Sequence, residues 1–248
     1  MWEEEEQEQL KDTSKMIDVA FRIECKTLPY DHAYDLSKAI TEHMPWLLKN
    51  KLTGIHTLHG PESGNGWVRS EKEEIFLSKR TRLVLRIPRI NINDAIKLEN
   101  ESINVLGSDI KVGKSSIKTF LVVRDLICRF VLCDKNETEE DFLLGVKKEL
   151  FSHGVLIKKA ICGKAKSLTI NGKDRFTRSL MIADLSKENS VLLQDSGLGD
   201  GRIYGCGIFL PHKSVDAVSL EDTTSKADVV SVCGDSDCGC DHRHTPSV

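Results

Sequence analysis

The sequence predicts an α+β fold built from two ferredoxin-like domains in tandem, each with the element order β-α-β-β-α-β. One observation is the length: 248 residues are enough for two domains of about a hundred residues each plus tails. The other is a succession of strand-like and helix-like segments that occurs twice along the chain. Hydrophobic residues make up 40% of the sequence, which excludes a wholly disordered protein. The halves share no evident sequence identity, so the repeat rests on pattern alone.

The first half begins with residues 17–25, which alternate apolar and polar side chains as a half-buried strand does. A helix follows, with Asp31 as its expected cap and Pro45 as its expected end. Its apolar face is defined by spacings of three and four residues, at Ala33, Leu36, Ile40, His43 and Leu47. The remaining predicted elements are two strands, a short helix and a pair of strands around a glycine turn, at 52–60, 81–88, 91–98 and 102–114.

The second half repeats this order. Residues 116–133 are predicted to form one long strand, and residues 139–154 a helix closed by Gly154. Three further strands, a helix and a final strand are expected, at 155–162, 166–172, 175–185, 186–197 and 202–211. The predicted organisation is an acidic extension, an N-terminal ferredoxin-like domain, a C-terminal one carrying a glycine-rich loop, and a disordered acidic tail, at 1–15, 16–116, 117–213 and 214–248.

The net charge of -3 conceals an uneven distribution. Residues 1–15 carry six acidic side chains against two lysines, and residues 214–248 carry seven against Lys226 and Arg243. Removing these -4 and -5 contributions leaves +6 on residues 16–213. The part expected to fold is therefore basic, and binding to a polyanion is possible.

Several classes of protein are excluded or disfavoured by the sequence. No apolar run approaches the ~18 residues of a membrane span, and the acidic start is unlike a secretory signal. Five cysteines scattered among strand-like segments indicate buried free thiols, and so we expect a cytoplasmic protein. The VGKSS segment at 112–116 resembles the end of a nucleotide-binding loop, but Ser108 stands where that motif requires glycine.

The segment at 197–209 holds five glycines in eleven residues, just before and inside a predicted strand. Such a density of glycines indicates that the backbone here closely approaches a ligand or another segment of the chain. One interpretation is a phosphate cradle, with N–H groups as donors and with added positive charge. The other is a glycine-rich hairpin or bulge. The residues concerned are Gly199, Gly201, Arg202, Gly205 and Gly207.

Four ordered motifs resemble the CRISPR-associated endoribonucleases of the RAMP superfamily that process repeat-containing precursor RNA, and the MYXAN-type subgroup in particular. They are LPYDHAYDL (28–36), PWL (45–47), GIH (54–56) and LQDSGLGDGRIYGCGIFLP (193–211). The resemblance implies two ferredoxin-like (RRM-like) domains and cleavage without a metal or cofactor. In that reaction the 2′-hydroxyl attacks the adjacent phosphate, leaving a 2′,3′-cyclic phosphate and a 5′-hydroxyl.

The resemblance also selects candidate catalytic residues. Histidine suits both proton transfers of this reaction because its pKa is near neutral. We expect His32, at the first turn of the predicted helix, to be a catalytic histidine, and His56 of the GIH motif to be the second candidate. Tyr34 could orient a histidine or donate to the phosphate. His43 is expected in the core, and His59 as a spare donor; structural roles remain open for all of them.

Two groups of basic residues are candidates for RNA binding. Arg80, Arg82 and Arg86 share one predicted strand region and could grip phosphates or simply cover a solvated face of the sheet. The second group places seven positive charges in twenty-one residues, with Asp174 the only acid among them. It consists of Lys158, Lys159, Lys164, Lys166, Lys173, Arg175 and Arg178. The resemblance implies more arginines at 164–178 than this sequence has. That shortage weakens the case for base-specific readout there.

The expected partners are CRISPR repeat RNA, both precursor and mature guide, and a multi-subunit CRISPR effector complex; no membrane is expected. The alternatives are a non-cleaving repeat-RNA-binding subunit and a tandem RRM-like protein that stacks bases of another RNA. An aromatic content of 6% disfavours the latter. No metal is expected. A zinc-type site in the tail is a minor alternative, because its cysteine spacing is not that of a zinc finger. It would involve Cys233, Cys238, Cys240, His242 and His244.

Overall fold

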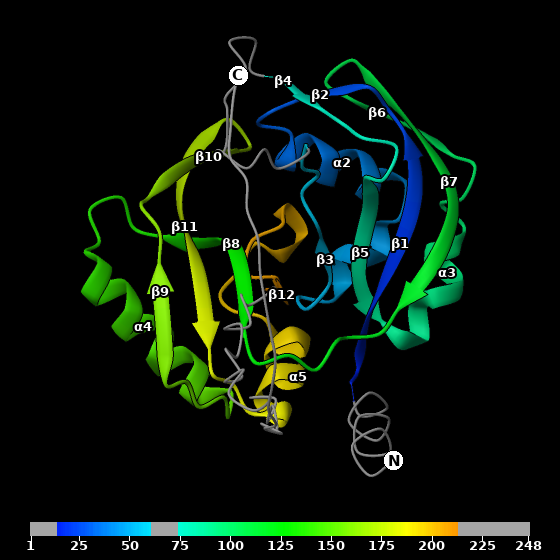
Figure 1. Cartoon of the computed structure of the whole chain (residues 1–248). Helices are drawn as coiled ribbons and strands as arrows, with labels where there is room; N and C mark the ends of the chain where they lie inside the picture. The colour runs from blue at the N-terminus through cyan, green and yellow to red at the C-terminus, as the bar shows by residue number, and fades with distance from the viewer. Residues whose placement is uncertain (1–13, 61–73, 213–248) are drawn as a thin grey trace, which may run out of the picture. The chain divides into compact units, whose positions relative to one another are not determined.

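The computed structural model describes residues 14–60 and 74–212 (Figure 1). These residues form two five-stranded antiparallel sheets and a two-stranded ladder, and both large sheets belong to one compact unit. The element order confirms the predicted α+β class with two ferredoxin-like halves. Within the described ranges, no helix is long and apolar enough to cross a membrane.

The first sheet has the strand order β3-β5-β1-β7-β6. Its first four strands are arranged as in a ferredoxin-like domain, and β6 is an additional edge strand that forms a hairpin with β7. The strands are β1 (Met16–Glu24), β3 (Gly54–Ile55), β5 (Arg82–Pro88), β6 (Ser102–Val105) and β7 (Ser108–Lys118). The helices are α2 (Ala33–His43) and α3 (Ile92–Ile96), with the 3-10 turns η1 (Pro45–Lys49) and η2 (Arg89–Asn91).

The second sheet has the order β10-β11-β8-β12, and β9 pairs with the far end of β11. It therefore repeats the ferredoxin-like arrangement, with the second strand divided into two pieces. The strands are β8 (Leu126–Cys133), β9 (Lys159–Cys162), β10 (Lys166–Ile170), β11 (Lys173–Ala183) and β12 (Phe209–Pro211). The helices are α4 (Glu139–Ser152) and α5 (Lys187–Ser196), and the turn η3 (Arg202–Tyr204) precedes β12.

Each sheet buries an apolar face under its helices. In β1 the side chains of Val19 and Phe21 are fully buried, and Leu36 and Ile40 of α2 belong to the same core cluster. The alternation of a strand then places Asp18 on the opposite face of the sheet. A separate cluster fills the second half, around β8, α4 and α5. The helix prediction was wrong about His43, which is exposed at the end of α2.

Three strand predictions were wrong in their extent. Residues 116–133 are not one strand, because β7 ends at Lys118 and the chain crosses to the other sheet before β8 begins at Leu126. Only Gly54–Ile55 of 52–60 and Phe209–Pro211 of 202–211 are strand. The pairing of β2 (Thr27–Pro29) with β4 (Glu74–Phe76) was not predicted. The shortened strands leave irregular backbone beside the candidate site.

Candidate active site

A cavity of about 330 Å³ opens between the segment after β3, strand β5, strand β8 and the glycine-rich loop. Among the described residues, the ionisable side chains that line it are histidine and arginine, and none is aspartate or glutamate. These side chains are His56, His59, Arg80, Arg82 and Arg129. Both halves contribute, since Arg129 lies on β8 and the others belong to the first half. Such a cavity suits a phosphate group.

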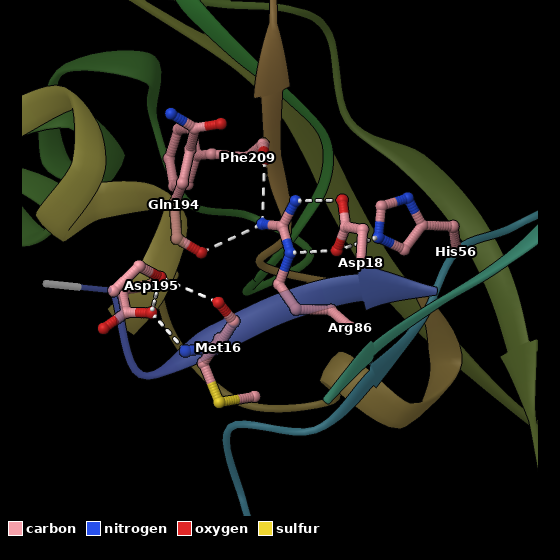
Figure 2. Close-up of polar contacts among 8 residues, drawn as sticks. Met16, Asp18, His56, Arg86, Gln194, Asp195 and Phe209 are labelled. Atoms are coloured by element: carbon pink, nitrogen blue, oxygen red, sulfur yellow. Dashed lines mark hydrogen bonds and ion pairs between the residues drawn. The ribbon is translucent and has the colours of Figure 1, made fainter. Parts of the chain in front are cut away.

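His56 lies at the end of β3, where its backbone N–H donates to the carbonyl of Val84 at 3.0 Å. Its side chain is 12% exposed, and Nε2 lies 3.7 Å from Oδ1 of Asp18. Figure 2 shows the second ring nitrogen directed away from this carboxylate. His56 is thus fixed by backbone pairing, has a negative charge on one side and contributes to the cavity wall.

His59 lines the same cavity, with Nε2 3.0 Å from Oγ1 of Thr57 and its ring stacked on Phe130 at a centroid distance of 6.4 Å. Burial lowers the pKa of His59 to about 3, and the nearby Arg129 guanidinium adds to this effect. His59 is therefore neutral at physiological pH and a poor source of positive charge.

His32 is 3% exposed, and both of its ring nitrogens are engaged. Nδ1 donates to the carbonyl of Pro29 at 2.8 Å, and Nε2 accepts the N–H of Leu58 at 3.1 Å. Burial lowers the pKa of His32, which favours the neutral ring that these bonds require. His32 therefore holds the 54–60 segment through the Leu58 N–H and is not among the described residues that line the cavity, and its catalytic role stays a prediction.

Tyr34 also lies outside the cavity wall. Its hydroxyl donates to Oδ1 of Asn171 at 3.1 Å, and its ring lies 5.9 Å from that of Tyr204. The carboxylate of Asp31, expected to cap the helix, instead accepts the N–H of Thr169 at 3.2 Å. These contacts join the start of α2 to the β10–β11 hairpin, so the structure places Tyr34 in packing between the halves.

The three arginines of the β5 region divide into two roles. Arg80 is exposed and Arg82 half-buried, and both line the cavity. Arg86 is 2% exposed, and its guanidinium bonds protein groups on both halves, so the structure contradicts its assignment to RNA binding. Arg129 was missed from the sequence, although its position next to buried Cys128 in an alternating strand indicates the opposite face.

The basic cluster of the second half is on the surface with one exception. Its exposed members are Lys158, Lys159, Lys164, Lys166, Lys173 and Arg175. Arg178 is 8% exposed and donates to the carbonyls of Gly163 and Glu137 at 3.0 and 2.8 Å. The assignment of Arg178 to RNA binding is corrected, because its guanidinium is already used within the fold.

Part of the glycine-rich loop is bonded within the fold. The N–H groups of Gly199, Gly205 and Gly207 donate to Glu149, to the Arg202 carbonyl and to the Phe130 carbonyl, at 2.7, 2.9 and 2.7 Å. Arg202 is 8% exposed and donates to the carbonyls of Lys51 and Ser196. The bonds of these four residues favour the hairpin interpretation, and the phosphate cradle stays a prediction; Gly201, also predicted for it, is the left-handed residue that precedes η3.

Close packing explains the glycines instead. A Cβ on Gly205 would lie 2.6 Å from Cγ2 of Thr57 and 3.2 Å from the carbonyl of Ile55. The absence of a side chain there lets the loop lie directly against the segment that carries His56. The glycine-rich loop therefore shapes one wall of the cavity through its backbone.

We expect Gly207→Ala to lower the free energy of unfolding by at least about 2 kcal/mol. Gly207 has φ +67°, and a Cβ would meet the Leu198 carbonyl oxygen at 1.9 Å. Gly172→Ala is the matched control, because Gly172 has φ +68° with nothing within 4 Å of its Cβ position. Urea unfolding of the two variants separates the clash from the backbone strain; equal losses would contradict this account.

Among the described residues, no group of three or more histidine, cysteine, aspartate or glutamate side chains is arranged to hold a metal ion. The tail cysteines and histidines considered from the sequence lie outside the described residues.

Two ferredoxin-like halves, with a glycine-rich loop packed beside a histidine- and arginine-lined cavity, define the class as a tandem ferredoxin-like protein. Solved structures share this fold. A CRISPR-associated protein Cas6 aligns with a TM-score of 0.57 and 12% identity, covering 80% of this chain and all of that one. The product of a Cas6-related gene from Pyrococcus furiosus gives 0.53 and 14%, covering 79% and 98%.

Sequence comparison identifies the family. The family model described as Cas6 Crispr matches residues 17–214, so the chain belongs to the Cas6 family of CRISPR-associated endonucleases. A curated relative, the CRISPR-associated endonuclease Cas6 of Myxococcus xanthus (strain DK1622), is 28% identical over 195 residues. That alignment covers 79% of this chain and 81% of the relative. The predicted resemblance is thereby confirmed.

Proposed function

We propose that this chain cuts precursor CRISPR RNA within its repeats by metal-independent transesterification, leaving a 2′,3′-cyclic phosphate and a 5′-hydroxyl. Membership in the Cas6 family supports the endonuclease activity. The observation that carries the mechanism is that the described part of the cavity lining holds two histidines and three arginines. Such a lining favours a phosphate over a divalent cation, and guanidinium groups supply the charge that stabilises a phosphorane.

His56 is the proposed proton-transfer group. Its neutral imidazole takes the proton from the 2′-hydroxyl, the 2′ oxygen bonds to phosphorus, and the bond from phosphorus to the 5′ oxygen breaks. The resulting imidazolium then holds the proton that the departing 5′ oxygen requires. Positive charge thus develops 3.7 Å from the Asp18 carboxylate, which stabilises it. Arg80, Arg82 and Arg129 are proposed to bind the scissile phosphate.

The exposed basic cluster of β9–β11 is the proposed binding track for the flanking RNA. Its six exposed members, from Lys158 to Arg175, provide phosphate contacts without sequence information. A solved RAMP protein that binds different RNA substrates has a comparable fold, with a TM-score of 0.53. Association with an effector complex is part of the same proposal. A non-cleaving role is disfavoured by a cavity equipped for proton transfer.

We expect repeat RNA to be cut at one site in excess EDTA, giving a 5′ fragment that ends in a cyclic phosphate. A 2′-deoxy nucleotide directly 5′ of the scissile bond removes the nucleophile and should abolish cleavage. The control RNA carries the deoxy substitution two nucleotides away and should be cut normally. Product termini are determined by mass spectrometry. Cleavage that requires added Mg²⁺, or that survives the first substitution, would refute the mechanism.

A further inference from the structure

Asp18 and Arg86 connect the cavity histidine to the second half of the chain (Figure 2). We propose that both are positioning residues: the second half holds Arg86, Arg86 holds Asp18, and Asp18 orients His56 and stabilises its protonated form. Cleavage then depends on correct docking of the two halves against each other. This inference rests on the proposed role of His56.

Arg86 makes four hydrogen bonds from a site that is 2% exposed. Nε and Nη2 donate to the two Asp18 oxygens at 2.8 and 3.0 Å, in the bidentate geometry that fixes a carboxylate. Nη1 donates to the carbonyls of Gln194, in α5, and Phe209, in β12, at 3.0 and 2.9 Å. The guanidinium also lies 4.5 Å from the ring centroid of Phe120. One side chain of the first sheet is thereby held by backbone groups of the second half.

Asp18 is the cross-strand neighbour of Arg86 in the β1–β5 pair, so strand register brings the two together. Burial by itself would raise the pKa of Asp18, but Arg86 and His56 outweigh burial and hold the pKa well below its usual range. Asp18 is therefore a carboxylate throughout the pH range of the reaction. Its Oδ1 atom lies between the guanidinium and Nε2 of His56.

Among the described residues, the other ionisable groups that line the cavity with His56 are cationic or neutral. Arg80, Arg82 and Arg129 line the cavity, and His59 is neutral above about pH 3. Arginines beside the ring oppose its protonation, whereas Asp18 supports it. Asp18 is consequently the carboxylate, among the described residues, that forms an ion pair with the His56 ring.

The test is Asp18→Asn, which keeps the size of the side chain and removes its charge. Single-turnover cleavage of repeat RNA is measured from pH 5 to pH 9 with enzyme in excess. We expect the rate to fall by about 10- to 100-fold and the acid limb of the profile to move to lower pH by about one pH unit. Asp18→Glu retains the charge and should leave that limb in place. Arg86→Lys keeps a cation but cannot make all four bonds, and should lower kcat more than it changes KM.

Asp195→Asn provides the matched control. Asp195 also joins the halves, accepting bonds from the Ser14 hydroxyl and the Met16 N–H at 2.8 Å each, but these contacts do not include His56 (Figure 2). The Asp195→Asn substitution should lower the melting temperature and leave the pH profile of cleavage unchanged. An unchanged rate and acid limb in a folded Asp18→Asn enzyme would overturn the inference, as would a shift of equal size in Asp195→Asn. If Asp18→Asn does not fold, an acid limb displaced in Asp18→Glu would also overturn it. An active His56→Ala enzyme would instead refute the proposed function itself.

Discussion

His56→Ala is expected to lower the rate constant for repeat cleavage by about 10²- to 10⁴-fold, the range lost when a general acid–base group is removed. RNA affinity should change little, because the arginines of the cavity and the exposed lysines of β9–β11 remain. The backbone N–H of His56 that pairs with Val84 is also unaffected. The measurement is single-turnover cleavage at saturating enzyme, with Kd determined separately on RNA carrying the blocking 2′-deoxy nucleotide.

Two other histidines of the first half serve as controls. His43→Ala changes an exposed residue at the end of α2 and should leave both rate and stability near the parent values. His32→Ala removes the acceptor of the Leu58 N–H and the donor to Pro29, so it should lower the melting temperature together with the rate. Full activity in His56→Ala, together with a rate loss at unchanged melting temperature in His32→Ala, would instead identify His32 as the general base.

The order of helices and strands could be predicted from the sequence because apolar residues recur with a different period in each type of element. Alternation in 17–25 and 81–88 predicted β1 and β5, and spacings of three and four predicted α2. The ends of strands were less predictable. Residues 56–60 keep a strand-like pattern, but pairing stops after His56 because the glycine-rich loop and the His32 ring take over the contacts of this segment.

The site was only partly readable because its geometry depends on contacts distant in sequence. The helix-start position of His32 is visible in the sequence, whereas its bond to the Leu58 N–H spans 26 residues. Period-two spacing places Arg82 and Arg86 on one face of β5, but it does not show which end of that face the second half covers. Arg82 therefore lines the cavity, and Arg86, four residues further along the strand, is buried.

Arg86→Met should lower the free energy of unfolding by about 3–5 kcal/mol, the usual loss when one partner of a buried ion pair is removed. Methionine fills much of the same space, but it leaves the Asp18 carboxylate without its main partner. It also removes the donor to the Gln194 and Phe209 carbonyls. The measurement is urea unfolding monitored by circular dichroism at pH 7, with Asp18→Asn/Arg86→Met as the control that removes the orphaned charge.

The pH dependence of this loss has a definite sign. The folded-state pKa of Asp18 is depressed, so the stability it contributes is present above the unfolded-state pKa, about 3.9, and is lost as pH falls further toward the folded-state value. In Arg86→Met, burial remains and the main cation is absent, so the carboxyl group protonates at higher pH than in the parent. The difference in stability between parent and variant should therefore shrink as pH falls from 7 to 3, starting where the variant's carboxyl group protonates. A difference that stays constant from pH 7 to pH 3 would show that packing, and not the Asp18 charge, accounts for the role of Arg86.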